Sequence, residues 1–276
     1  KGCFTTILAG HDAVENLISN DIIKAVTLTG SEKAGKKIAE TAGKNLKKTV
    51  LELGGNNACI VLDDADLDKY MDIIVNARMQ NTGQSCIAAK RFIVTENIYD
   101  RFLKQFKEKV AALKYGDPMD EKTTFGTLAR TDLADTLKKQ IEDSVTLGAT
   151  VVMGNQQDKA YFEPTILTGI TKDMPVFKEE TFGPVAPIMK VKNADEAFKM
   201  ASETRYGLGT MIFTQSIEVA QNHIATVEDG AYFINELVKS DPRLPFGGTK
   251  ASGYGRELSM EGIHEFVNRK TVFINH

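Results

Sequence analysis

Cys86 and Glu52 are the two side chains in this sequence whose types and settings suit covalent chemistry. Cys86 ends the segment 81–86, NTGQSC, in which small and polar residues predict a turn that exposes one thiol. Glu52 opens the segment ELGG, so its carboxylate stands beside a tight Gly-Gly turn. A thiolate is a nucleophile, and a carboxylate with a raised pKa is a general base. An isolated cysteine is more often an inert apolar residue, so the other motifs must decide.

The segment 29–35, TGSEKAG, lies where a predicted strand gives way to a predicted helix. Gly30 permits a tight turn there, and the free backbone N–H groups at a helix start can bind a phosphate. Ser31 is also a natural helix N-cap. The segment has neither the lysine of a P-loop nor the GxGxxG dinucleotide pattern. A plain helix cap and a cofactor site therefore both stay open at this point.

Two later segments join an aromatic ring to glycine-rich turns. In ETFGP, 180–184, Glu180 could accept hydrogen bonds from both hydroxyls of a ribose, and Phe182 could pack on a nicotinamide. For that motif alone, an ordered turn with a core phenylalanine is the simpler interpretation. The loop 245–257 holds Phe246 and several glycines, which let its backbone approach a ligand closely.

Metal ions and nucleic acids are not indicated as ligands. The acidic run that starts at Asp64 has Lys69 and Val75 where a calcium loop needs glycine and glutamate. The histidines share no ligand spacing, so we expect no metal. A net charge of −3 with dispersed basic residues selects no nucleic acid. No apolar run predicts a membrane span, and three widely spaced cysteines favour a reducing compartment, hence the cytoplasm.

Strands alternate with helices along most of the chain, which predicts an α/β fold with a parallel sheet. Such sheets bind ligands at the carboxyl ends of their strands. The apolar patterns predict strands at 4–9, 22–29, 49–53, 58–62, 91–94, 150–153, 164–167, 185–191, 211–214, 231–235 and 271–274. They predict helices at 11–19, 31–42, 66–79, 99–113, 133–147, 194–202, 217–225 and 260–265.

Four motifs together resemble the NAD(P)-dependent aldehyde dehydrogenases. ELGG at 52–55, GQSC at 83–86, ETFGP at 180–184 and PFGG at 245–248 occur in the order and spacing of that family. The resemblance covers essentially all 276 residues. Within the family, CIAAKRF at 86–92 is most similar to bacterial succinate-semialdehyde dehydrogenases.

The resemblance implies a domain organisation. Residues 1–53 are expected to form the last strand–helix units of a Rossmann-like NAD(P)-binding domain. Residues 54–250 would form an α/β catalytic domain, and 251–276 a C-terminal helix and an oligomerisation strand. A homodimer or homotetramer is therefore expected. The start at a lysine, on entry to a strand, suggests the later part of a longer polypeptide.

The resemblance also implies a mechanism. Cys86 would attack the aldehyde carbon, giving a thiohemiacetal that is oxidised to a thioester, and Glu52 would activate water to hydrolyse that thioester. The backbone N–H of Cys86 is expected to help stabilise the oxyanion.

For the cofactor, NAD or NADP, Glu180 is implied as ribose ligand and Phe182 as nicotinamide contact. Gly30 and Ser31 are implied as pyrophosphate neighbours, and Leu53 as a further cofactor contact.

Substrate recognition departs from the family pattern. Many succinate-semialdehyde dehydrogenases hold the distal carboxylate with a serine, which Ser240 matches, and with an arginine where this chain has Gln80. Arg243 or Arg78 could take that part, because a guanidinium fork matches a carboxylate. Phe246 is expected to line the substrate tunnel.

The family pattern includes an oxyanion asparagine, a ribose-binding lysine and opening strands that these residues do not contain. A polypeptide of these residues alone is therefore expected to be inactive. Three alternatives remain open: a non-catalytic truncated subunit or oligomer scaffold, a thioester-forming hydrolase, and a coenzyme A-acylating dehydrogenase. Retention of Glu52 argues against the last, because a water-activating base would compete with thiol transfer.

Overall fold

The computed structural model describes residues 2–276, which divide into two compact units. The small unit comprises the chain up to Leu53 together with 240–248 and 252–276. The large unit comprises 54–239 and 249–251. The bond between Leu53 and Gly54 therefore joins one unit to the other, and each unit is described by itself.

A short three-stranded sheet forms the centre of the small unit. Strand β1 (Ala25–Thr29) runs parallel to β2 (Lys48–Glu52), and β14 (Gly253–Tyr254) adds to β2 in the antiparallel direction. The helices are α1 (His11–Ser19), α2 (Glu32–Lys44) and α9 (Ser259–Glu265). Gly253 has φ +109°, and a Cβ there would lie 1.9 Å from the Leu51 carbonyl oxygen. Only glycine allows β14 to approach β2 this closely.

Helix α2 begins at the predicted Ser31 cap. The Ser31 hydroxyl accepts a hydrogen bond from the Ala34 N–H at 3.3 Å, which satisfies one of the unpaired donors of the first turn. Gly35 lies one turn into the helix, where a Cβ would lie 2.6 Å from the Leu53 side chain. This glycine allows α2 to pack directly against the end of β2.

The large unit is built on a seven-stranded sheet with the order β12-β11-β3-β4-β9-β8-β5. All neighbouring pairs are parallel except β5 with β8, so the predicted α/β class with a parallel sheet is confirmed. The strands are β12 (Ala231–Ile234), β11 (Gly209–Phe213), β3 (Asn57–Val61), β4 (Ala89–Thr95), β9 (Val185–Val191), β8 (Thr165–Thr168) and β5 (Thr150–Met153).

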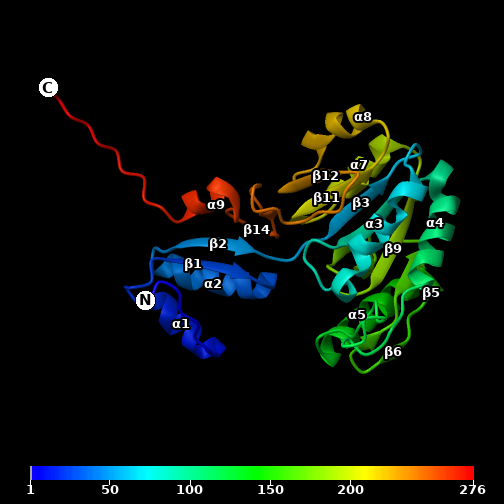
Figure 1. The fold of residues 1–276 in the computed structure, drawn as a ribbon, viewed down its shortest axis with the longest axis horizontal. Coiled ribbons are helices and arrows are strands. Elements are labelled where there is room, and N and C mark those ends of the chain that lie inside the picture. The colour runs from blue at the N-terminus through cyan, green and yellow to red at the C-terminus, as the bar shows by residue number, and fades with distance from the viewer. Residues whose placement is uncertain (1) are drawn as a thin grey trace. The chain divides into compact units, whose positions relative to one another are not determined.

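Each face of this sheet carries its own apolar core, because successive strand residues point to opposite faces. On one face Cys59 and Val61 pack with α3 (Leu67–Met79) and α4 (Glu96–Ala111). On the other face Ala58 and Ile60 pack with α7 (Ala194–Ser202) and α8 (Ile217–Asn222). Figure 1 shows the strands of this sheet with α4 and α7 alongside them. A sheet buried on both faces explains the nearly continuous apolar strands of the sequence.

The remaining elements of the large unit surround this layered core. Helix α5 (Thr131–Thr146) packs on α6 (Pro175–Lys178) over a third apolar cluster. Hairpin β6–β7 (Gln157–Asp158 and Tyr161–Phe162) and the pair β10–β13 (Tyr206–Gly207 and Thr249–Lys250) are short. Two 3₁₀ turns complete it, η1 (Gln80–Gly83) and η2 (Ile224–Thr226).

Two predicted strands are wrong. Residues 4–9 and 271–274 form no strand, and within residues 2–276 neither segment has a paired neighbour. A strand needs such a neighbour to satisfy its backbone groups, and Phe273 is 84% exposed. The oligomerisation strand expected in the C-terminal segment is therefore absent from this single chain, and a role in assembly stays a prediction. None of the helices within the described residues has the length and apolar character needed to span a membrane.

Candidate active site

Cys86 lies in the large unit, partly exposed, on the loop that leads from η1 into β4. The turn before it has left-handed backbone. Asn81 and Thr82 have φ values of 51° and 57°, which strain residues with a Cβ, and Gly83 has a φ of 72°, which glycine adopts freely. The Asn81 amide donates to the Gln84 carbonyl oxygen at 2.9 Å, which closes the turn from within. The polar and small residues that predicted an exposed thiol thus form the predicted turn.

A second loop fixes this turn from outside. A Cβ on Gly83 would lie 2.4 Å from the Gly183 carbonyl oxygen, so the two backbones are in direct contact. The Gln84 side chain accepts a hydrogen bond from the Ala129 N–H at 2.8 Å. The glycine of GQSC is thus required by the close approach between the two motifs, whereas a Cβ on Gly183 of ETFGP would lie 2.5 Å from the Leu137 side chain.

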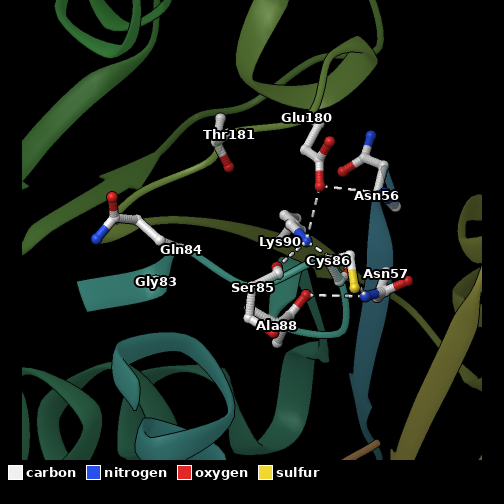
Figure 2. Close-up of polar contacts among 12 residues, drawn as sticks. Asn56, Asn57, Gly83, Gln84, Ser85, Cys86, Ala88, Lys90, Glu180 and Thr181 are labelled. Carbon is white, nitrogen blue, oxygen red and sulfur yellow. Dashed lines mark hydrogen bonds and ion pairs between the residues drawn. The ribbon is translucent and has the colours of Figure 1, made fainter. Parts of the chain in front are cut away.

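Asn57 and Lys90 hold the backbone of the loop that carries Cys86, called the Cys86 loop below. Both donate to the Cys86 carbonyl oxygen at 2.7 Å, and Asn57 also donates to the Ala88 carbonyl oxygen at 3.0 Å (Figure 2). The Asn57 side-chain oxygen accepts from the Gly209 N–H at 3.1 Å. Neither residue belongs to the site residues predicted from the motifs. Polar side chains at the start of an otherwise apolar strand are the signal that could have revealed them.

Glu180 and Cys86 are brought together through Lys90. One Glu180 oxygen accepts from the Gly55 N–H at 3.1 Å and pairs with the Lys90 ammonium at 3.1 Å (Figure 2). A Cβ on Gly54 would lie 2.1 Å from the other Glu180 oxygen, so the Gly-Gly turn makes room for this carboxylate. Phe182 is 38% exposed, and the Lys90 ammonium lies 5.9 Å from the centre of its ring.

Arg78 is a structural cation and is not available to substrate. Its guanidinium is fully buried and donates to the carbonyl oxygens of Ala89 at 2.7 Å, Gly83 at 2.6 Å and Thr181 at 3.4 Å. Burial lowers the pKa of Arg78 to about 9, with Glu180 acting in the opposite direction. The suggestion that Arg78 binds a substrate carboxylate is therefore wrong.

Glu52 lies in the small unit as the last residue of β2. Its carboxylate is buried, and within residues 2–276 neither oxygen has a hydrogen-bond partner. Burial raises the pKa of Glu52 to about 8, and the Glu257 carboxylate adds to the rise while Arg256 opposes it. A Cβ on Gly247 would lie 2.9 Å from one of its oxygens, so the PFGG turn packs closely against this carboxylate. Such a group can take up a proton near neutral pH.

The predicted phosphate-binding turn lies in the small unit. The Gly30 N–H donates to the Glu52 carbonyl oxygen at 2.9 Å, which ties the turn to the end of β2. The Ser31 side chain is engaged as the cap of α2, so the capping interpretation is satisfied and a phosphate contact stays a prediction. Leu53 is buried, and its side chain packs against Gly35. Its expected contact with the cofactor also stays a prediction.

The predicted substrate residues lie on the 240–248 segment of the small unit. Ser240 is exposed, and the Arg243 side chain is 85% exposed. Arg243 is held by Asp241 in a two-point pair, with N–O distances of 2.9 and 2.6 Å. Phe246 is half-buried, and its backbone pairs with Glu257 in both directions.

The predicted residues therefore fall into two groups. Cys86, Glu180 and Phe182 belong to the large unit, where Lys90 links them. The small unit holds Glu52, Leu53, Gly30, Ser31, Ser240, Arg243 and Phe246.

A partly exposed thiol on a tight turn, a cation-paired carboxylate and an α/β sheet agree with the resemblance given by the motifs. The chain belongs to the aldehyde dehydrogenase family, which it matches over residues 1–272. It is 46% identical to the NADP(+)-dependent succinate-semialdehyde dehydrogenase 1 of Mycobacterium ulcerans and 47% identical to the corresponding enzyme of Mycobacterium avium. Each alignment covers 99% of this chain. The chain spans only about 60% of the length of these curated relatives.

Solved structures give the same family. The succinic semialdehyde dehydrogenase of Streptococcus pyogenes in complex with NADP+ superposes with a TM-score of 0.94 at 43% identity. That match covers 97% of this chain and 60% of the other. A glyceraldehyde-3-phosphate dehydrogenase of Methanocaldococcus jannaschii, complexed with NADP, gives a TM-score of 0.87 at 37% identity, over 92% of this chain and 55% of the other. The predicted similarity to the family and to bacterial succinate-semialdehyde dehydrogenases is confirmed.

Proposed function

We propose that this chain carries the catalytic cysteine of an NADP-dependent aldehyde dehydrogenase whose substrate is succinate semialdehyde. The observation that carries the proposal is the Cys86 loop, whose carbonyl oxygen is fixed by Asn57 and by the same Lys90 that pairs with Glu180. The relatives from two mycobacteria, both named for that aldehyde and for NADP(+), support the substrate and the cofactor.

The residues present suit a dinucleotide cofactor. The Glu180 carboxylate is held by the Gly55 N–H and Lys90 yet keeps 18% of its side chain exposed, which suits a ligand for a ribose diol. The exposed face of Phe182 suits packing against a nicotinamide. Gly30 and Ser31, at the start of a 13-residue helix, suit a phosphate. Bound NADP+ would supply the two-electron oxidation of the substrate.

The covalent steps then belong to Cys86. Its thiolate adds to the aldehyde carbon and forms a carbon–sulfur bond, while the carbonyl electron pair moves to oxygen as an oxyanion. The Cys86 backbone N–H is the donor that this chain offers to that oxygen. Oxidation of the thiohemiacetal leaves an acyl group on the sulfur as a thioester.

Hydrolysis of the thioester is assigned to Glu52. Its carboxylate takes a proton from water as the hydroxyl oxygen adds to the acyl carbon, and the thiolate of Cys86 then leaves. With a pKa of about 8, the carboxyl is partly ionised near neutral pH and gains base character as the pH rises through 8. Burial, with no hydrogen-bond partner among residues 2–276, is the feature that suits Glu52 to this task.

Selection of an acidic aldehyde is assigned to Arg243 with Ser240. The exposed guanidinium can form a charge-assisted fork with a carboxylate. Asp241 already occupies that fork, so the substrate carboxylate must share it or displace Asp241. Asp241 therefore weakens binding of an acidic aldehyde more than it weakens binding of an uncharged one. In this way Asp241 tunes the preference for acidic over uncharged aldehydes.

The test is a substrate panel on the whole protein, including any residues that flank this chain. Succinate semialdehyde, butyraldehyde and glyceraldehyde 3-phosphate are assayed with NAD and with NADP, with Cys86→Ala as the control. We expect the highest kcat/KM for succinate semialdehyde with NADP and no turnover by the control. Equal turnover by Cys86→Ala, or cofactor-independent ester cleavage as the dominant activity, would contradict the proposal. Absence of all turnover with a folded protein would favour the scaffold alternative.

A further inference from the structure

Lys90 occupies an unusual position for a lysine, because its side chain is fully buried beside the candidate nucleophile. Its ammonium donates to the carbonyl oxygens of Ser85 at 2.6 Å and Cys86 at 2.7 Å. It also pairs with the Glu180 carboxylate at 3.1 Å (Figure 2). The same ammonium lies over the Phe182 ring, 5.9 Å from its centre. Lys90 thus contacts the Cys86 loop, the predicted ribose ligand Glu180 and the predicted nicotinamide contact Phe182.

A bulge in the sheet accompanies this placement. Strand β3 pairs with β4 through Asn57 with Ala89 and then through Ala58 with Arg91, so β4 inserts Lys90 as an extra residue. A bulge re-aims the side chain of its extra residue. Lys90 extends toward the Cys86 loop, whereas Arg91 donates to the carbonyl oxygens of Met200 at 3.0 Å and Ala201 at 2.7 Å near the end of α7.

We propose that Lys90 is a positioning residue that holds the Cys86 loop in one conformation and stabilises the Cys86 thiolate by its charge. The inference deepens the proposed function, because it concerns how the nucleophile of that reaction is prepared. It rests on that function for the role of Cys86, but its test does not require turnover.

The conformational part follows from the carbonyl contacts. Lys90 holds the carbonyl oxygens of Ser85 and Cys86, and Arg78 holds those of Gly83 and Ala89. The two buried cations therefore clamp both ends and the middle of the loop. Hydrogen bonds from a charged donor are stronger than neutral ones, so the loop keeps one backbone path around the thiol.

The charges around Cys86 favour a thiolate. Arg78 and Lys90 carry two positive charges, and Glu180 supplies one negative charge against them. A thiolate at the partly exposed Cys86 would be a second anion beside these buried cations, which lower the cost of forming it. The pKa of Lys90 is consistent with this: burial lowers it to about 8, while Glu180 and Cys86 act to raise it and Arg78 to lower it.

The experiment measures alkylation of Cys86 by iodoacetamide from pH 5 to 9, without aldehyde or cofactor. The Cys86 peptide is followed by mass spectrometry, because Cys3 is exposed and Cys59 is buried. Lys90→Met removes the charge but keeps the length of the side chain, and Lys90→Arg keeps the charge. Glu180→Gln is the matched opposite, since it removes the counter-anion but retains an acceptor oxygen.

We expect Lys90→Met to move the midpoint of the alkylation profile upward by at least about one pH unit, with alkylation about tenfold slower at pH 7. Glu180→Gln should move the midpoint downward, and Lys90→Arg should stay near the wild type. A loop that had merely become loose would change the rate at every pH without moving the midpoint. An unmoved midpoint in Lys90→Met, or shifts of the same sign in Lys90→Met and Glu180→Gln, would overturn the proposal.

If Lys90→Met does not fold, the alkylation profile of Glu180→Gln is the deciding measurement. An unmoved or raised midpoint in Glu180→Gln also overturns the proposal. The outcome is separable from the proposed function. A low wild-type midpoint that depends on Lys90, in a protein that oxidises no aldehyde, would refute the function and leave this inference standing.

Discussion

Replacing Glu52 with glutamine is predicted to remove turnover and, at alkaline pH, to stabilise the protein. Glu52 is buried with both oxygens unpaired among the described residues, and its pKa is raised to about 8 from the ordinary 4.5. Because the folded-state pKa lies above that of the unfolded chain, the protonated carboxyl favours folding at low pH. That contribution is lost as the pH rises through about 8. Glutamine never ionises, so the variant escapes the loss.

The size of the effect follows from the pKa. Ionising this carboxyl at pH above 8 costs at most about 5 kcal/mol of folding free energy, at roughly 1.36 kcal/mol per pKa unit. The surrounding protein relaxes around a buried charge and has a higher effective dielectric constant than a dry interior, so we expect about 2–3 kcal/mol. At pH 5 the wild-type carboxyl is protonated when folded, and the two proteins should have nearly equal stability.

Thermal unfolding of wild type and Glu52→Gln at pH 5 and pH 9 provides the assay. The variant should unfold several degrees higher at pH 9 and within about one degree of wild type at pH 5. Glu257→Gln is the matched control, because it removes the neighbouring charge but leaves the carboxyl of Glu52 in place. It should recover only a small part of the stabilisation. Equal stability differences at the two pH values would refute the assignment of a raised pKa to Glu52.

In the whole protein, including any residues that flank this chain, Glu52→Gln should release one equivalent of NADPH per site and then slow, with kcat reduced by about 10²- to 10⁴-fold, since the thioester forms but is hydrolysed slowly. Full steady-state turnover would contradict this. Gly54→Ala should raise KM for the cofactor about tenfold or more, because the new Cβ would lie 2.1 Å from a Glu180 oxygen and displace that carboxylate. An unchanged KM would contradict this prediction. Arg243→Ala should lower the preference for succinate semialdehyde over butyraldehyde about tenfold, whereas Asp241→Asn should raise it. A polypeptide of residues 1–276 alone should show no turnover in an NADPH assay, and normal turnover would overturn that expectation.

Apolar periodicity was sufficient to predict most elements of the fold. Helix α1 and strands β5 and β9 have the predicted bounds, because each has clear apolar spacing between breaking residues. The wrong predictions concern segments 4–9 and 271–274, whose β-branched and apolar residues favour extended backbone. Composition reports that preference, but a strand also requires a hydrogen-bonded neighbour, which no local pattern reveals.

The candidate site could be predicted only in part. Motif spacing identified Cys86, Glu180 and Phe182, which the large unit brings together through Lys90. Motif spacing could not identify Asn57, whose side-chain amide donates to two carbonyl oxygens of the Cys86 loop. Such contacts depend on which strands become neighbours, and β3 is next to β4 only in the folded sheet.

The start of β4 shows most clearly why sequence alone falls short. The pair Lys90 and Arg91 resembles the solvated end of a strand, and the apolar pattern accordingly predicts a strand only from Arg91. Both side chains are instead fully buried and reach carbonyl oxygens of different segments. Lys90, the extra residue of the bulge, donates to Cys86, and Arg91 donates to Ala201 near the end of α7. Burying two cations is costly unless they are hydrogen-bonded or paired. The proposed role of Lys90 at the Cys86 thiol gives a reason for burying that cation beside the Cys86 loop, and thiol alkylation of the Lys90 variants tests it directly.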